Sequence, residues 1–213
     1  MHNSYLKNKA DQLTGVVILV GRKGILPWGI KKFMQWEGLL TGEADYKPPE
    51  NHSGILINYK GKLQVFEAIK EGEVIRPIEE SLDHATSITL LRPKPPLDED
   101  EKEKLIQYCE KRVKEGHKYQ VMNFIQWIFF IRSRHAEKKG LWVGRRKKKR
   151  AIKTYCYECT ARAMNAARGG LAWWDPEITS IWKYYNHPDL VELSPIELEW
   201  FLDEVKIMTL MGC

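Results

Sequence analysis

Residues 53–68 carry the local pattern that most restricts how this chain can fold. Ser53–Tyr59 and Lys62–Ala68 are runs of strand-forming residues, and only Lys60-Gly61 separates them. A two-residue connection that contains glycine is typical of a tight turn between antiparallel strands. The sequence therefore predicts a β-hairpin, and with it an antiparallel sheet.

The same turn predicts the register of the two strands. If Tyr59 pairs with Lys62, Gly54 lies opposite Glu67. Because side chains alternate between the faces of a sheet, His52, Gly54 and Glu67 then share one face. His52 lies diagonal to Glu67, at about 7–8 Å between Cα atoms, which is within reach of a side-chain hydrogen bond. A slip of one residue would destroy this relation.

Helix-like and strand-like segments alternate along the rest of the chain, which indicates an α+β protein. We expect strands where runs of β-branched residues are bounded by glycine or proline. We expect helices where apolar residues recur at helical spacing and follow acidic residues or a capping box. The expected strands are Gly15–Gly21, Glu73–Pro77 and Ser87–Leu91. The expected helical segments are Pro27–Trp36, Ile78–His84, Asp98–Glu115, Tyr119–Arg132, Cys156–Arg168 and Ser194 to about Glu204, with an irregular stretch over Leu171–Asp189.

Composition favours one globular domain over residues 1–213. Hydrophobic residues make up 43% of the 213 residues and charged residues 29%, which excludes general disorder. The four cysteines are too few for a secreted disulfide scaffold. Residues 1–11 lack an apolar signal region, and the apolar run Val121–Ile131 is shorter than the ~20 residues of a membrane span. We therefore expect a cytoplasmic protein without a membrane span.

The net charge of +6 is concentrated in one segment. Arg145–Arg150, together with Lys138, Lys139 and Lys153, supplies more than the whole excess. Because the rest of the chain is close to neutral, we predict no specific nucleic-acid binding. The segment is interpreted as a solvated basic loop inserted at about residues 135–153, which could also steer an anionic substrate or surface towards the protein.

Cys156 stands at the start of a predicted helix rich in small residues. The positive end of the helix dipole and the free backbone N–H groups there favour a thiolate and can hold an oxyanion. A cysteine at a helix start is more often a small buried hydrophobe. Our hypothesis is that Cys156 is a nucleophile and that His52 is its base.

Cys156 and Cys159 also form a C-x-x-C motif. A structural zinc site normally needs a second pair of ligands, and no such spacing occurs elsewhere in the sequence. A thioredoxin-like redox pair needs a βαβ context, whereas this chain is antiparallel in character. We therefore predict no metal and no cofactor, and we interpret Cys159 as a core residue.

Four motifs, in this order, resemble those of the circularly permuted NlpC-type papain-like hydrolases, and within them the YiiX/YaeF-like group. The match covers roughly Gly15 to Pro195. Two positions depart from the family pattern: the acid after Gly15 is missing, and Gln120 replaces an acid after Tyr119. Gly15–Val20 resembles the "GDILL"-type strand, and Asn51–Ile55 resembles "SHVGI". Val65–Ala68 resembles "V-x-E-A", and Tyr155–Cys159 resembles "Y-C-S-E-L". Gly116–Tyr119 also resembles the start of "G-K-P-Y-D".

The resemblance implies a papain-like fold in which an antiparallel sheet packs against the nucleophile helix. It also implies a cysteine hydrolase that acts on a peptide, amide or other acyl substrate. Cys156 would be the nucleophile, His52 the base and Glu67 the residue that orients His52. The remaining candidates, for substrate binding, are Tyr119, Tyr155 and Glu158, of which Tyr119 is also a candidate for the second oxyanion donor.

Other interpretations stay open at this point. The departures at Gly15 and Gln120 are compatible with a non-catalytic binding or virion-associated protein on the same scaffold. An acyltransferase or thioesterase, as in lecithin:retinol acyltransferase-like proteins, would use the same pair of residues. For Glu158, a plain salt bridge with Arg162 one turn later is the simpler interpretation.

Overall fold

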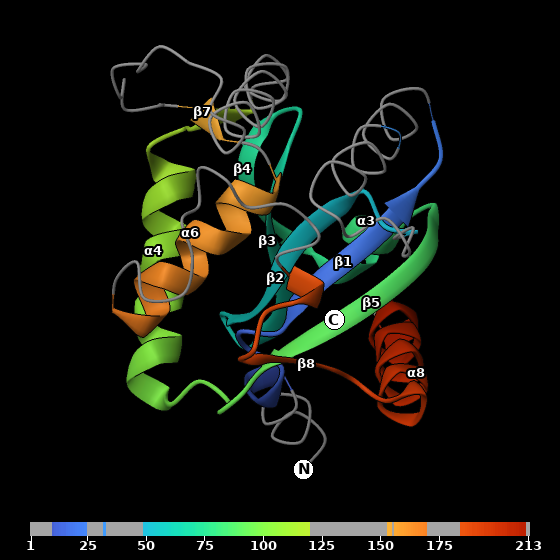
Figure 1. Ribbon diagram of the computed structural model, residues 1–213. Coiled ribbons are helices and arrows are strands. Elements are labelled where there is room, and N and C mark those ends of the chain that lie inside the picture. Colours follow the sequence, from blue (N-terminus) through green and yellow to red (C-terminus); the bar gives the residue numbers. More distant parts are fainter. Residues whose placement is uncertain are drawn as a thin grey trace, which may run out of the picture.

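The predicted hairpin lies inside a six-stranded sheet (Figure 1). The computed structural model describes residues 10–24, 32, 49–119, 153–154, 156–169 and 184–211. Strands β2 (His52–Tyr59) and β3 (Lys62–Ile69) pair with Tyr59 opposite Lys62 and Gly54 opposite Glu67. The two turn residues have positive φ angles, 54° at Lys60 and 79° at Gly61, as a type I′ turn requires. The predicted hairpin and its register are confirmed.

All neighbouring strands of the six-stranded sheet run antiparallel, in the order β4-β3-β2-β1-β5-β8. A second, two-stranded parallel sheet joins β6 to β7. The remaining strands are β1 (Val17–Arg22), β4 (Gly72–Pro77), β5 (Ala85–Pro93), β6 (Lys118–Tyr119), β7 (Lys153–Thr154) and β8 (Leu190–Glu192). The antiparallel sheet expected from the sequence is therefore present.

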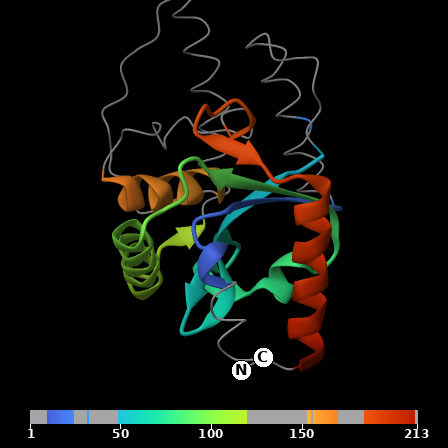
Figure 2. The ribbon, with the colours of Figure 1, turned by 90° about the horizontal axis from the view of Figure 1, so that it is seen from below.

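Helices cover both faces of the sheet (Figures 1 and 2). Side chains of β1 alternate between two hydrophobic clusters, with Val17 and Leu19 in one and Ile18 and Val20 in the other. The first cluster contains residues of α4 (Glu99–Lys114) and α6 (Cys156–Arg168), and the second contains residues of α3 (Ile78–Leu82) and α8 (Pro195–Met211). Burial on both faces explains why β1 is an uninterrupted apolar run.

Side-chain caps fix the starts of α4 and α8. The carboxylate of Asp98 accepts a hydrogen bond from the Glu101 backbone N–H at 2.8 Å, and the carboxylate of Glu101 accepts one from the Asp98 backbone N–H at 3.1 Å. Ser194 and Glu197 make the equivalent exchange ahead of α8. Both starts therefore lie where the sequence predicts them, from the acidic residues at Asp98 and from the capping box at Ser194.

The sequence interpretation was wrong in two places and missed one strand. The missed strand is β8, a three-residue edge strand that is too short to show alternation. Helix α8 continues to Met211 instead of ending near Glu204, because no glycine or proline stops it there. Tyr119 belongs to β6, where it pairs with Thr154, so no helix begins at this residue.

Several predictions fall outside the described residues. These are the helix over Pro27–Trp36 apart from Lys32, the remainder of the helix over Tyr119–Arg132, and the basic segment Arg145–Arg150. Within the described ranges, no helix has the length and apolar character that crossing a membrane requires.

At Gly54, on β2, the neighbouring atoms leave no room for a side chain. A Cβ atom there would lie 2.6 Å from Val65 Cγ1 and 3.3 Å from Glu67 Cβ. We expect Gly54→Ala to lower the free energy of unfolding by about 1–3 kcal/mol, because the hairpin must shift to accept the methyl group. Urea denaturation followed by circular dichroism measures this change.

Gly61→Asn is the matched control for that variant. Gly61 has no neighbouring atom within 4 Å of an added Cβ, and asparagine tolerates its positive φ. Its stability should change by less than about 0.5 kcal/mol. Equal stability of Gly54→Ala and the wild type would contradict the close contact with Glu67.

Candidate active site

The carboxylate of Glu67 joins side chains from β1, β2, β4 and α3 into one polar cluster. Its side chain is fully buried. Oε2 bonds to His52 Nε2, and Oε1 accepts from Arg76 Nε and, at 2.8 Å, from Ser81 Oγ. Arg22 Nη2 lies 3.7 Å from Oε2. The predicted contact between His52 and Glu67 is therefore present, and three further residues share the carboxylate.

Opposing effects set the protonation states of Glu67 and His52. Burial acts to raise the pKa of Glu67, but His52 and Arg76 outweigh it and lower the pKa to about 2. Burial acts to lower the pKa of His52, but the Glu67 carboxylate and the hydrogen bonds with Cys156 and Glu67 raise it to about 9. At neutral pH the pair is therefore a carboxylate and an imidazolium.

His52 also connects the cluster to Cys156. A side-chain hydrogen bond with Cys156 is among the interactions that raise the pKa of His52. Because Nε2 bonds to Glu67, Nδ1 is the ring nitrogen that remains for the sulfur. The fold thus brings together the three residues proposed from the sequence as nucleophile, base and orienting residue.

The first turn of α6 is fastened to β2 next to His52. Cys156 is the first residue of α6 and is 3% exposed. Thr160 Oγ1 donates to the carbonyl of Cys156 at 3.1 Å and lies 3.2 Å from Ser53 Oγ. These contacts hold the N-terminus of the helix, and with it the thiol, beside the start of β2.

The other sequence candidates have different surroundings. Glu158 is buried and forms an ion pair with Arg162 at 2.6 Å, the salt bridge expected one turn apart. The backbone of Tyr119 pairs with Thr154, two residues before Cys156, which places β6 next to the segment that leads into α6. Tyr155 lies outside the described residues.

Arg76, Ser81 and Arg22 were not identified from the sequence. Arg76 could have been found by extending the hairpin register, because Val74 lies opposite Glu67 and Arg76 follows two residues later on the same face. Ser81 and Arg22 come from α3 and from the end of β1. No local pattern connects these two residues to Glu67.

Cys159 lies in the core, as expected. It is 1% exposed, belongs to the hydrophobic cluster around α6, and burial raises its pKa well above the usual value. Within the described ranges, no group of three or more His, Cys, Asp and Glu side chains could hold a metal ion. The residues present there do not fit a metal site.

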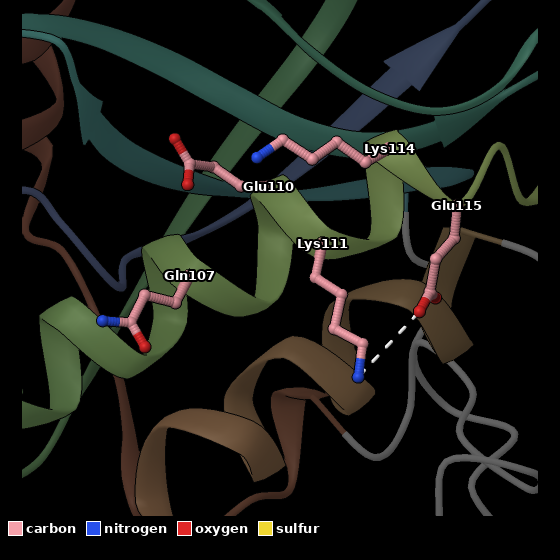
Figure 3. Close-up of a pocket in the computed structure, with 5 residues that line it drawn as sticks. All are labelled: Gln107, Glu110, Lys111, Lys114 and Glu115. Atoms are coloured by element: carbon pink, nitrogen blue, oxygen red, sulfur yellow. Dashed lines mark ion pairs between the residues drawn. The ribbon is translucent and has the colours of Figure 1, made fainter.

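A depression on the exposed side of α4 is a separate feature (Figure 3). Five residues of this one helix and its C-terminal cap line it, and none belongs to the cluster around Glu67. An ion pair of 3.9 Å joins two of them. The lining residues are Gln107, Glu110, Lys111, Lys114 and Glu115.

A solved structure shares this architecture. The crystal structure of the metalloprotein YiiX from Escherichia coli O157:H7 matches with a TM-score of 0.58 and 16% sequence identity, covering 87% of this chain and 97% of that chain. The fold is YiiX-like. No protein-family model and no curated protein matches the sequence. At this identity, the likeness to YiiX concerns the fold alone.

Because Glu67 and His52 form an ionised pair, we predict that Glu67→Gln lowers stability by an amount that depends on pH. The pair contributes fully above the ordinary pKa of Glu67, 4.5, and below that of His52, 6.5. We expect the variant to lose about 3 kcal/mol in this window, because removing one partner leaves buried charge uncompensated. As the pH rises through about 9, His52 loses its proton and the difference from the wild type shrinks.

Denaturation in urea at several pH values measures this difference. Part of it should persist at high pH, because Arg76 and Ser81 still bind the carboxylate. Glu197→Gln removes a half-exposed ion pair with Arg92 and is the control, with an expected change below about 1 kcal/mol. A pH-independent loss in Glu67→Gln would contradict the ionised pair.

Proposed function

We propose that this protein is a thiol hydrolase of the amidase or peptidase type, with Cys156 as its nucleophile. One observation carries the proposal: the His52 ring bonds to the Glu67 carboxylate, and the contact of Thr160 with Ser53 and with the Cys156 carbonyl holds the start of α6 beside His52. Acyl-enzyme chemistry needs a nucleophile, a base next to it and a residue that orients the base.

In the first half of the proposed reaction the acyl group moves to the enzyme. The imidazolium of His52 and the N-terminus of α6 both favour negative charge on the Cys156 sulfur. The sulfur attacks the carbonyl carbon of an amide, so that a C–S bond forms and the carbonyl oxygen becomes an oxyanion. His52 gives its proton to the leaving nitrogen, the C–N bond breaks, and a thioester remains on Cys156.

The second half regenerates the enzyme. His52, now neutral, takes a proton from water while the water oxygen attacks the thioester carbonyl. The C–S bond breaks, the carboxylic acid leaves, and His52 again carries a proton beside the thiolate. An amine or alcohol in place of water would make the protein an acyltransferase, and a thioester substrate would make it a thioesterase.

The oxyanion would be held at the start of α6. The backbone N–H of Cys156 belongs to the first turn, where helical N–H groups have no partner within the helix. Tyr119 is our candidate for the second donor, because its strand pairs with the segment two residues before Cys156.

The permuted papain-like assignment is part of the same proposal. In the NlpC-type group that the sequence resembles, the base precedes the nucleophile, and here His52 on β2 precedes Cys156 on α6. Helix α6 contacts β2 and β3, the two strands that carry His52 and Glu67. The YiiX-like fold is compatible with this assignment.

Selective alkylation tests the proposed nucleophile. With limiting iodoacetamide near pH 7, we expect Cys156 to react first, because its sulfur lies beside the imidazolium of His52. His52→Gln should slow this reaction by about tenfold or more, since the variant removes that positive charge. Peptide mapping by mass spectrometry identifies the labelled residue.

Cys159 provides the internal control for alkylation. It lies on the same helix, is equally buried and has a raised pKa, so it should stay unlabelled while Cys156 reacts. Slow and uniform labelling of all cysteines, unchanged in His52→Gln, would contradict an activated thiol. That outcome would favour a non-catalytic binding protein on the same scaffold.

Acyl trapping tests the reaction class. The protein is incubated with matched amide, ester and thioester compounds, and intact mass spectrometry follows the acyl group on the chain. We expect an adduct on Cys156 that disappears with time as free acid forms, and no adduct on Cys159 in a Cys156→Ala variant. Turnover of esters or thioesters alone would replace the amidase proposal with the thioesterase or acyltransferase alternative.

A further inference from the structure

Arg22 stands at the end of β1 with its backbone fixed near His52. The side chain of Asn51 accepts a hydrogen bond from Arg22 N at 3.2 Å and donates one to Arg22 O at 2.9 Å. Val20 pairs directly with His52, and the β1–β5 register shifts between Gly21 and Arg22. Arg22 thus ends β1 two residues beyond the strand partner of His52, and it still pairs with Ala85 of β5.

The guanidinium of Arg22 reaches the polar cluster around Glu67. Its Nη2 donates to the carbonyl of Ser81 at 2.7 Å and lies 3.7 Å from Glu67 Oε2. This oxygen is the one that bonds to His52. The side chain remains 24% exposed, so one part of the group is anchored and another part meets solvent.

Arg22 has guanidinium donors for which the described residues offer no acceptor. One of them is Nε, which is buried and has no hydrogen-bond partner among these residues. Within the described part of the chain, the carbonyl of Ser81 is the one acceptor of a hydrogen bond from this guanidinium, which carries five N–H donors. A buried donor without an acceptor is unfavourable, and a bound water, ion or ligand group is one way to satisfy it.

The Glu67 carboxylate lies within 4 Å of three cationic groups, Arg22, Arg76 and the protonated His52. Asp83 is a further negative group that acts on Arg22. Burial lowers the pKa of Arg22, and the charge of Glu67 opposes that shift. A guanidinium keeps its charge in proteins, and this one is therefore a fixed cation next to the carboxylate oxygen that bonds the proposed base, His52.

We infer that Arg22 binds a carboxylate group of the substrate, close to the carbonyl that Cys156 attacks. The inference rests on the proposed function and specifies its substrate class as amides or other acyl compounds with a negative charge near the scissile bond. A planar carboxylate suits the donors of a guanidinium, and the anchoring by Asn51 and Ser81 fixes their direction before the substrate binds.

Two pairs of alkylating reagents test this inference. Iodoacetate and iodoacetamide differ by a carboxylate next to the reacting carbon, and N-(iodoacetyl)glycine and its amide differ by a carboxylate farther away. For each pair, the rate at which the anionic reagent alkylates Cys156 is divided by the rate of the neutral reagent. This ratio is then divided by the same ratio for glutathione, which corrects for the intrinsic reactivity of the two reagents. We expect the wild type to favour at least one of the anionic reagents about tenfold, as one charge-assisted contact allows.

Arg22→Met should remove this preference while the neutral reagents still alkylate Cys156. Arg22→Lys keeps the charge without the planar donors, and it should retain part of the preference. Arg92→Met is the matched control, because it removes one positive charge at a half-exposed pair with Glu197 and should leave the ratio unchanged. Thermal unfolding checks that each variant is folded.

The outcomes separate this inference from the proposed function. Selective labelling of Cys156 with equal normalised rates for charged and neutral reagents would overturn the role of Arg22 and leave the nucleophile in place. A fall in all rates in Arg22→Met, at a constant ratio, would also overturn it, because Arg22 would then act on the thiol alone. A failure of every reagent to prefer Cys156 would contradict the proposed function itself.

Discussion

The buried carboxylate of Glu67 is the group on which the rest of the site depends. A charge that is removed from water needs partners of opposite charge and hydrogen-bond donors, or it loses its ionisation. Here His52, Arg76 and Ser81 bind the two oxygens, and Arg22 lies nearby. Because these residues come from four different elements, one carboxylate fixes how β1, β2, β4 and α3 meet.

The packing around the hairpin determines where that carboxylate can lie. Gly54 leaves room directly opposite Glu67, since any side chain there would meet Val65 and Glu67 itself. On α6, a run of alanines at 0–1% exposure allows the helix to approach β2 and β3 closely. Small residues at two places thus bring a strand-borne histidine and a helix-borne cysteine together, which is the geometry that thiol chemistry requires.

Much of the fold and part of the site could be predicted because the rules involved are local. The two-residue turn at Lys60-Gly61 sets the register, and the register sets the neighbour of His52. Capping patterns at Asp98 and Ser194 likewise fix two helix starts. The three-residue strand Leu190–Glu192 escaped prediction because it shows no alternation and depends on its contact with β5.

By itself, the sequence determined the hairpin, its register and the pairing of His52 with Glu67, since turn chemistry and the two-residue period of a strand act over a few residues. The tertiary structure decided which further groups share the carboxylate, and it brought the start of α6, with Cys156, to the beginning of β2. No periodic rule connects residues so far apart in the chain. Their meeting depends on how α6 packs against the sheet, a consequence of burying apolar surface over the whole domain.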